Sequence, residues 1–252
     1  MSTFIGFPVA ASDAAARIDA LFLGLLLVTG TVCVVILLLL VVFCVRYRAG
    51  SSADRSNAPT GNRPLEIAWI VAPLLAFIAI YAWAAYDYGN LYRAPPDAMP
   101  VFIVAKQWMW KLEHNNGRRE IDELHVPLNR PVRLVMTSQD VIHSFFVPAF
   151  RIKQDVLPGR YTSIWFRPTA LGEFHLFCAE YCGTDHAHMG GRIVVMEPTQ
   201  FASWLQQGVP DGSLAARGFD LFRRYGCSGC HAAGSTVHAP DLNGLLGRVV
   251  HL

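Results

Sequence analysis

The stretch Cys178-Ala-Glu180-Tyr-Cys182-Gly-Thr-Asp-His186-Ala-His-Met189 brings two thiols, two imidazoles and a thioether together within one short segment. A further histidine, His143, lies upstream in Asp-Val-Ile-His-Ser-Phe-Phe. Soft sulfur ligands combined with imidazole favour copper in a site that moves electrons. One copper ion needs only one cysteine, so the second indicates a binuclear centre in which Cys178 and Cys182 both bridge the metal ions.

Two other chemistries remain open for this cysteine pair. In an oxidising compartment, Cys178 and Cys182 could form a small disulfide loop. They could also be half of a zinc site, although zinc rarely takes methionine. Either alternative leaves His143, His186 and Met189 without a role.

Two long uncharged segments account for a composition that is 53% hydrophobic. Residues 20–45 and residues 67–86 each contain no charged side chain, and each could cross about 30 Å of hydrocarbon as a helix. We therefore expect membrane helices over about residues 18–45 and 65–88. A buried helix of a soluble protein is the alternative for either, and the second segment contains Pro73. The first lacks the basic leader and cleavage site of a signal peptide, so we expect a retained anchor.

The charges between the two segments indicate the orientation. An excess of basic residues marks the cytoplasmic side of a membrane. Everything after the second segment is therefore expected on the periplasmic side. The net charge of +2 gives no indication of a nucleic-acid partner. The orientation follows from the loop between the two segments, which has four basic residues and one acid: Arg46, Arg48, Arg55 and Arg63, against Asp54.

Short apolar runs separated by turn residues follow the second membrane segment. Residues 101–105, 132–137, 162–166 and 192–196 are strand-like, with breakers such as Asn-Asn-Gly and Pro-Gly between them. Several short strands in succession indicate a β-sandwich. Trp108 and Trp110 follow the first strand, and a spacing of two places both on one face of a strand. We expect Trp110 to pack in the core.

A third region carries a different signature. Residues 199–213 are polar and are expected to be a linker. Beyond them, Cys227-Ser-Gly-Cys230-His231 has the Cys-x-x-Cys-His spacing of haem c attachment, in which His231 would bind the iron. A thioredoxin-like redox pair is the alternative, but its βαβ setting is not visible. No methionine follows Met196 to bind the sixth iron position, so we expect a truncated domain, with the haem absent, five-coordinate or completed by a missing segment.

Together these motifs resemble cytochrome c oxidase subunit II, the copper-A subunit, of the subtype with a fused C-terminal cytochrome c domain. The resemblance covers most of the chain. It implies a membrane-anchored protein of several domains: a two-helix transmembrane hairpin in residues 1–98, a cupredoxin-like Greek-key β-sandwich in residues 99–198, and a partial all-α class I cytochrome c segment in residues 214–252.

The same resemblance implies a ligand set for copper-A. Cys178 and Cys182 would be the bridging thiolates, His143 and His186 would each complete one copper, and Met189 would be a weak ligand. The backbone carbonyl of Glu180 would bind one copper. Its side chain would reach a magnesium ion shared with subunit I.

Further roles concern residues outside the ligand set. Trp108 would be the position where electrons arrive from cytochrome c. Glu66 would lie at the cytoplasmic mouth of a proton channel, although an acid at a helix N-terminus is also ordinary, because the helix dipole favours it. Five acids could attract a basic cytochrome c, namely Glu120, Asp122, Glu123, Asp140 and Asp155.

The implied function is that of subunit II of a haem–copper terminal oxidase in the inner (plasma) membrane, with its copper and haem domains in the periplasm. It would relay electrons from cytochrome c to haem in subunit I, where oxygen is reduced to water and protons are pumped. Subunits I and III would be its partners, and no catalytic residue is expected in this chain. Rivals are a nitric-oxide or nitrous-oxide reductase subunit, a quinol oxidase subunit II, and a non-enzymatic copper carrier or assembly module.

Overall fold

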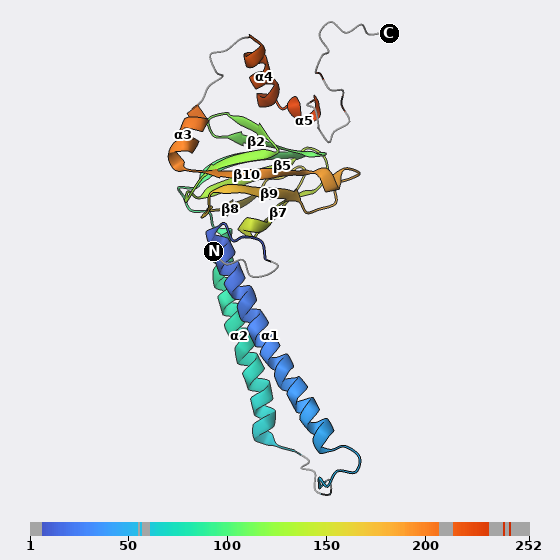
Figure 1. The fold of residues 1–252 in the computed structure, drawn as a ribbon. Coiled ribbons are helices and arrows are strands. Elements are labelled where there is room, and N and C mark those ends of the chain that lie inside the picture. The colour runs from blue at the N-terminus through green and yellow to red at the C-terminus, as the bar shows by residue number, and fades with distance from the viewer. Residues whose placement is uncertain are drawn as a thin grey trace. The chain divides into compact units, whose positions relative to one another are not determined.

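A computed structural model describes residues 7–54, 56, 61–206, 214–231, 239 and 242 of the chain. These residues form two compact units (Figure 1). One unit is Arg17–Asn90, and the other combines Met1–Ala16 with Leu91–Leu252. Most of the expected cytochrome segment after residue 231 lies outside the described residues.

The first unit is a pair of long helices, α1 (Asp13–Arg46) and α2 (Arg63–Tyr92). Both are long and apolar enough to cross a membrane, with mean hydropathies of 3.2 and 2.2 over their most apolar windows. Asp13 lies in the first turn of α1 and Arg46 in its last turn, as the helix dipole favours. The helices contain both segments expected from the sequence, and each extends a few residues further.

The second unit is built around two five-stranded sheets. The first sheet has the order β3 (Arg119–Ile121), β2 (Met109–His114), β1 (Met99–Lys106), β5 (Val132–Ser138) and β8 (Thr162–Phe166). The second has the order β4 (Glu123–Pro127), β10 (Gly190–Met196), β9 (Gly172–Cys178), β6 (His143–Val147) and β7 (Ile152–Val156). Short 3-10 helices, η1 (Pro148–Phe150) and η2 (His186–His188), interrupt the loops. The expected β-sandwich is confirmed.

The core lies between the sheets and follows from side-chain alternation. Along β1 every second residue is buried, which is the period of a strand with one face on a core. Pairing is mixed, since β1 is parallel to β5 and β10 is parallel to β4. Trp110 is fully buried and meets Phe145 edge-on at 5.3 Å, as expected for a core residue.

One of the connections between the two sheets is a single residue long, namely Asp122, which lies between β3 of the first sheet and β4 of the second. Its φ of 55° turns the backbone sharply. Asp122 N donates to Trp110 O at 2.9 Å, and Arg192 N donates to Asp122 O at 2.9 Å. Gly191 permits this contact, because an added Cβ would lie only 2.3 Å from Asp122 O. The corner therefore ties both sheets together.

The region expected to be a linker starts with a helix instead. Helix α3 (Pro198–Gln206) begins with proline, which suits a first helical turn. Phe201 and Trp204, three positions apart, share one helix face and pack against the sandwich. The glutamines and other polar residues that flank these aromatics made the stretch look like a linker. Residues 207–213 lie outside the described part.

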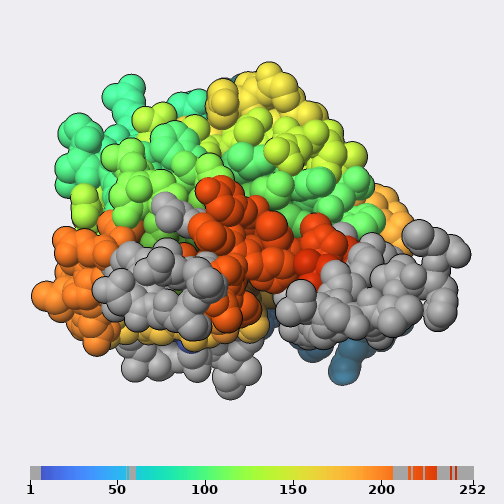
Figure 2. All heavy atoms as spheres, turned by 90° about the horizontal axis from the view of Figure 1, so that it is seen from above, coloured from blue at the N-terminus to red at the C-terminus, as the bar shows by residue number. Residues whose placement is uncertain are grey.

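Two short helices follow, α4 (Leu214–Arg224) and α5 (Ser228–His231). They lie over strands of the first sheet, coloured orange-red to red in Figure 2. Gly229 comes so close to β2 that an added Cβ would be 3.2 Å from Met109 Sδ. The Cys-x-x-Cys-His segment is thus adjacent to the sandwich.

Candidate metal centre

Neighbouring strands bring the expected copper ligands together. His143 is the first residue of β6, and Cys178 is the last residue of β9, which pairs with β6 in the register Phe145↔Cys178. Cys178 N donates to Met189 O at 3.1 Å, which closes the loop that carries the remaining ligands. The two sheet strands therefore fix one end of a compact ligand cluster.

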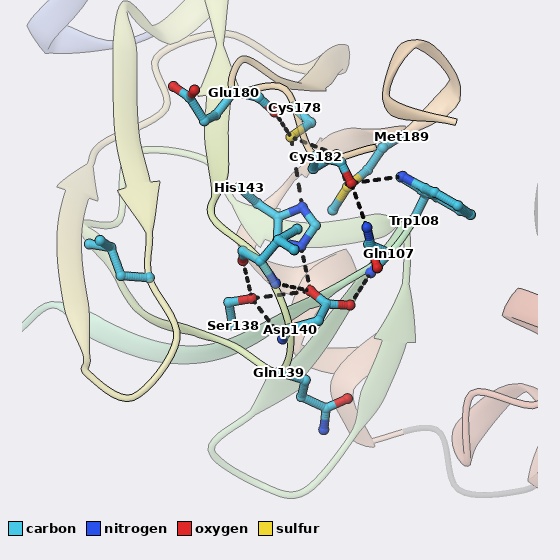
Figure 3. Close-up of polar contacts among 12 residues, drawn as sticks. Gln107, Trp108, Ser138, Gln139, Asp140, His143, Cys178, Glu180, Cys182 and Met189 are labelled. Atoms are coloured by element: carbon cyan, nitrogen blue, oxygen red, sulfur yellow. Dashed lines mark hydrogen bonds and ion pairs between the residues drawn. The ribbon is translucent and has the colours of Figure 1, made fainter. Parts of the chain in front are cut away.

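The side chains of this cluster form a continuous series of contacts (Figure 3). His143 Nδ1 lies 3.9 Å from Cys178 Sγ, which lies 3.8 Å from Cys182 Sγ. Cys182 Sγ in turn lies 3.4 Å from His186 Nδ1 and 3.7 Å from Met189 Sδ. A disulfide needs sulfurs about 2.05 Å apart, so the two cysteines are free thiols here.

The cluster is enclosed and rich in sulfur. His143, Cys178, Cys182 and Met189 have exposed fractions of 0%, 8%, 2% and 2%. Glu180 differs, because its side chain is exposed while its backbone carbonyl lies 3.3 Å from Cys178 Sγ. The resemblance assigns the carbonyl of Glu180 to copper and its carboxylate to magnesium, and both roles stay predictions.

The donor set suits copper. A metal–thiolate bond is about 2.3 Å long, so two thiolates at the observed separation are close enough to bind the same ions. Each sulfur also faces one imidazole Nδ1, and one faces a thioether. Thiolate, imidazole and thioether together favour copper over zinc, which seldom takes methionine.

The cysteines differ in acidity because of their neighbours. Burial raises the pKa of Cys178, but its hydrogen bonds with His143 and with other neighbours together outweigh burial and lower that pKa to about 6. Burial and the charge of Cys178 both raise the pKa of Cys182. Burial lowers the pKa of His143, yet its contacts with Cys178 and Asp140 raise it on balance. Cys178 is thus the thiol that ionises first, and metal binding requires such ionisation.

Asp140 orients His143, a role that sequence reasoning missed. Asp140 Oδ1 lies 2.8 Å from His143 Nε2, which leaves Nδ1 facing the sulfurs. Carboxylates commonly hold ligating histidines in this way. The same carboxylate accepts hydrogen bonds from Gln107 N at 2.8 Å and Val141 N at 2.7 Å. Its position three residues before His143 was the available signal.

Trp108 lies beside the cluster, in the turn between β1 and β2. Its Nε1 donates to Cys182 O at 3.2 Å, and Gln107 Nε2 donates to the same oxygen at 2.7 Å. The expectation that Trp108 and Trp110 share one strand face is wrong, because Trp108 lies in the turn and only Trp110 lies in β2. The Gln107–Trp108 peptide bond is cis. Gln107 was not singled out from the sequence.

The five acids expected to attract a cytochrome c each have a hydrogen-bond or ion-pair partner, and Glu120 and Glu123 share His125. Glu120 is enclosed by two imidazoles, with Oε1 2.7 Å from His114 Nε2 and Oε2 beside His125 Nδ1. Asp122 accepts from Trp110 N, and Asp140 holds His143. The two remaining acids pair with bases, Glu123 with Arg192 and Asp155 with Lys153. The expectation that these acids attract a basic cytochrome c stays a prediction.

The other expected site residues lie outside the cluster. Cys227, Cys230 and His231 occupy one helical turn, in which His231 N donates to Cys227 O at 2.9 Å. Cys227 is exposed, and the other two are half-buried. Glu66 lies in the first turn of α2, where its Oε1 accepts a hydrogen bond from Asn62 N at 3.3 Å. That contact is the ordinary capping role of an acid at a helix start.

Two apolar helices and a β-sandwich with an enclosed sulfur–imidazole cluster define a membrane-anchored electron-transfer protein. Residues 101–197 match the family described as cytochrome c oxidase subunit II, periplasmic domain. Residues 1–85 match the transmembrane domain of the same subunit. The chain therefore belongs to the cytochrome c oxidase subunit II family. Membership makes it a membrane-anchored subunit of an oxidase complex, with its sandwich on the periplasmic side and a subunit I as partner.

The chain is also similar to individual proteins. The cytochrome c oxidase subunit 2 of Cereibacter sphaeroides is 29% identical over 244 residues, which cover 80% of this chain and 79% of the relative. The alternative cytochrome c oxidase subunit 2 of Bradyrhizobium diazoefficiens is 27% identical, covering 79% and 82%. A crystal structure of the periplasmic domain of subunit II of cytochrome oxidase from Bradyrhizobium japonicum is 33% identical, covers 45% of this chain and 95% of that one, and has a TM-score of 0.43.

Proposed function

We propose that the enclosed cluster holds a copper pair and that the chain serves a haem–copper oxidase as its electron-transfer subunit. The observation that carries the proposal is the pair of free, buried thiols, each with an imidazole nitrogen within 4 Å. A bound copper pair supplies a centre that accepts and gives up one electron at a time.

The ligand roles follow the contacts of the cluster. Cys178 and Cys182 would both hold the copper pair, His143 and His186 would each supply an imidazole nitrogen, and Met189 would add a weak thioether ligand. The carbonyl of Glu180 faces the same space, and its exposed carboxylate is free to reach a magnesium ion shared with subunit I.

The proposed electron route uses Trp108 as the receiving group for electrons from cytochrome c. Its indole N–H is bonded to Cys182 O, which gives a short connection from the ring to a ligand residue. From the centre, electrons pass to haem in subunit I, where oxygen is reduced to water and protons are pumped. Subunit III completes the proposed complex in the inner membrane.

Two further roles are proposed from sequence pattern. Cys227 and Cys230 attach a haem c, with His231 as an iron ligand, because their spacing and shared helical turn suit that chemistry. Glu66 serves a proton channel on the cytoplasmic side, a role compatible with its position at the start of α2.

Electron paramagnetic resonance with copper quantitation tests the copper proposal on the full chain in detergent. We expect two copper ions per chain that share one unpaired electron, and the loss of this paired signal in Cys182→Ser. A single-copper signal, bound zinc or a Cys178–Cys182 disulfide in the loaded protein would contradict the proposal.

The structure argues against one alternative function, that of a copper carrier or assembly module. A carrier needs ligands that exchange readily with a partner, whereas Cys178, Cys182 and Met189 are enclosed. We therefore expect copper to leave slowly when a chelator is added. Loss of copper within seconds would favour the carrier. A separate measurement, whether the purified complex consumes oxygen or nitric oxide, distinguishes an oxidase from a nitric-oxide reductase.

A further inference from the structure

We propose that Gln107 is a positioning residue that holds both halves of the copper site in register and thereby sets the potential of the centre. The inference rests on the proposed copper function. Gln107 is not itself a ligand in this account. It acts through two other residues, Cys182 and Asp140, each of which it contacts with a different group.

The side chain of Gln107 fixes the loop that carries the cysteines. Gln107 Nε2 donates to Cys182 O at 2.7 Å, and Trp108 Nε1 donates to the same oxygen at 3.2 Å (Figure 3). A carbonyl oxygen has two lone pairs, and these two donors occupy both. The peptide group of Cys182 therefore has a fixed direction.

The backbone of Gln107 fixes the histidine on the other side. Gln107 N donates to Asp140 Oδ2 at 2.8 Å, and Asp140 Oδ1 lies 2.8 Å from His143 Nε2. A continuous series of hydrogen bonds thus runs from Cys182 through Gln107 and Asp140 to His143. Two ligands that are distant in sequence are held by one residue.

Gly183 shows how closely Gln107 fits. A Cβ added at Gly183 would lie 2.9 Å from Gln107 Nε2 and 3.2 Å from the Trp108 ring. The φ of Gly183 is +118°, a conformation that other residues rarely adopt. The chain after Cys182 therefore lies directly against the amide, which leaves it little room to move.

The physical consequence concerns the reduced state. Both N–H groups direct the positive ends of their dipoles at Cys182 O, a backbone atom of a ligand residue, and positive charge density beside a ligand favours the state that holds one more electron. Hydrogen bonds around a metal's ligands tune its potential, and fixed ligands limit rearrangement during electron transfer. Loss of the Gln107 amide should therefore lower the potential while copper remains bound.

The chain offers a matched control in Gln139. This glutamine lies on the loop next to Asp140, and its side chain points away from the cluster in Figure 3. It is exposed, and its Oε1 accepts a hydrogen bond from Lys111 Nζ at 3.4 Å. Gln107→Met and Gln139→Met thus make the same chemical change at one site that touches Cys182 and one that does not.

The test is a redox titration of the copper-loaded full chain in detergent, with copper content and the paramagnetic signal measured on each sample. We expect Gln107→Met to keep both copper ions and to favour oxidation about threefold, which at 59 mV per tenfold is about 30 mV lower. Gln139→Met should titrate like the wild type. A wild-type potential in Gln107→Met, or an equal shift in Gln139→Met, would overturn the inference.

A second variant keeps the inference testable if Gln107→Met fails to fold or to bind copper. If Gln107→Met binds no copper, Gln107→Asn retains an amide that ends one carbon short of Cys182 O, and its potential must lie below that of the wild type. A wild-type potential in Gln107→Asn would then reject the role of Gln107. A wild-type chain without the two-copper signal would instead defeat the proposed function, so the two failures are distinguishable.

Discussion

The carboxyl group of Asp122 is enclosed at the corner between the sheets, where it accepts a hydrogen bond from Trp110 N at 2.7 Å. Burial raises the pKa of Asp122 to about 7, although the bond from Trp110 acts in the opposite direction. The unfolded chain releases this proton near pH 4. Between about pH 4 and pH 7 the folded state therefore holds the extra proton, and folding stability falls as the pH rises through this range.

Asp122→Asn should weaken this pH dependence. We expect the variant to lose less stability than the wild type between pH 5 and pH 8, with a difference in slope of about 1 kcal/mol per pH unit. Denaturant unfolding followed by tryptophan fluorescence measures it. Asp97→Asn, at an exposed acid, is the control and should follow the wild type. Equal slopes in all three proteins would show that Asp122 is ionised in the folded chain.

Met189→Leu should change the potential of the copper centre without emptying it. Leucine has a similar volume, so the buried position 3.7 Å from Cys182 Sγ stays filled while the thioether is lost. A weak ligand of this kind tunes the potential rather than holding the metal. Redox titration and the visible spectrum of the loaded chain give the readout. An unchanged potential and spectrum would remove Met189 from the ligand set.

Gly183→Ala should destabilise the ligand loop more than a change of backbone angle alone explains. The added methyl group meets both the strained φ of +118° and the side chains of Gln107 and Trp108. We expect a loss of about 2–3 kcal/mol. Gly159→Ala is the control, because its φ is +73° but nothing lies within 4 Å, and about 1 kcal/mol is expected there. Equal losses in thermal unfolding would contradict the steric contribution.

At the level of single residues, sequence pattern predicted the cluster because its members lie in two short motifs. It could not predict Gln107 and Asp140 as their supports. The partners of Gln107 lie 33 and 75 residues away, and the contact depends on how the turn between β1 and β2 faces the cysteine loop. No local spacing contains that information.

Among the elements, α3 is held by aromatic and cationic contacts that make a specific prediction. The Arg118 guanidinium lies 3.9 Å above the Trp204 ring, and His125 stacks on the same ring at 4.4 Å. Trp204→Ala should cost about 2–3 kcal/mol and release α3 from the sandwich. Hydrogen exchange of the α3 amides measures this release, and Ser203→Ala on the exposed side is the control. Unchanged protection in Trp204→Ala would show that other contacts hold the helix.

The predictability of an element depended on the composition of its two faces. The runs at β1, β5, β8 and β10 were recognisable because apolar residues dominate them. Strand β7, Ile152–Val156, has apolar residues only at its ends. Strands β6 and β9 were not predicted, because their residues were interpreted only as metal ligands. Helix α3 escaped notice because its two packing aromatics lie among polar residues such as Gln200, Ser203 and Gln206.

For the whole molecule, copper removal should lower the unfolding temperature of the sandwich. The ligands come from β6, β9 and the following loop, so the metals cross-link elements that separate on unfolding. A ligand that binds only the folded state stabilises it by an amount that grows with the logarithm of the ratio of free ligand to Kd. We expect copper to add about 2 kcal/mol to the free energy of unfolding. The loaded chain should therefore melt several degrees above the copper-free chain.

Cys182→Ser provides the matched test of that prediction. This variant lacks one bridging thiolate, so added copper should raise its melting temperature much less than that of the wild type. Calorimetry with and without copper measures both differences. Equal stabilisation of both proteins would indicate copper bound elsewhere on the chain.

The attachment of α3 also limits how far the segment that begins at Leu214 can lie from the sandwich. Asn116 Nδ2 donates to Leu205 O at 3.0 Å, and Arg118 donates to Trp204 O, so the last turn of α3 is fastened to the β2–β3 corner. From Gln206 to Leu214 the backbone can span at most about 28 Å. A redox group carried on Cys227 and Cys230 would thus remain at millimolar effective concentration beside the sandwich, whatever the amount of free cytochrome outside. The supply of electrons would then be set by tether length instead of by diffusion.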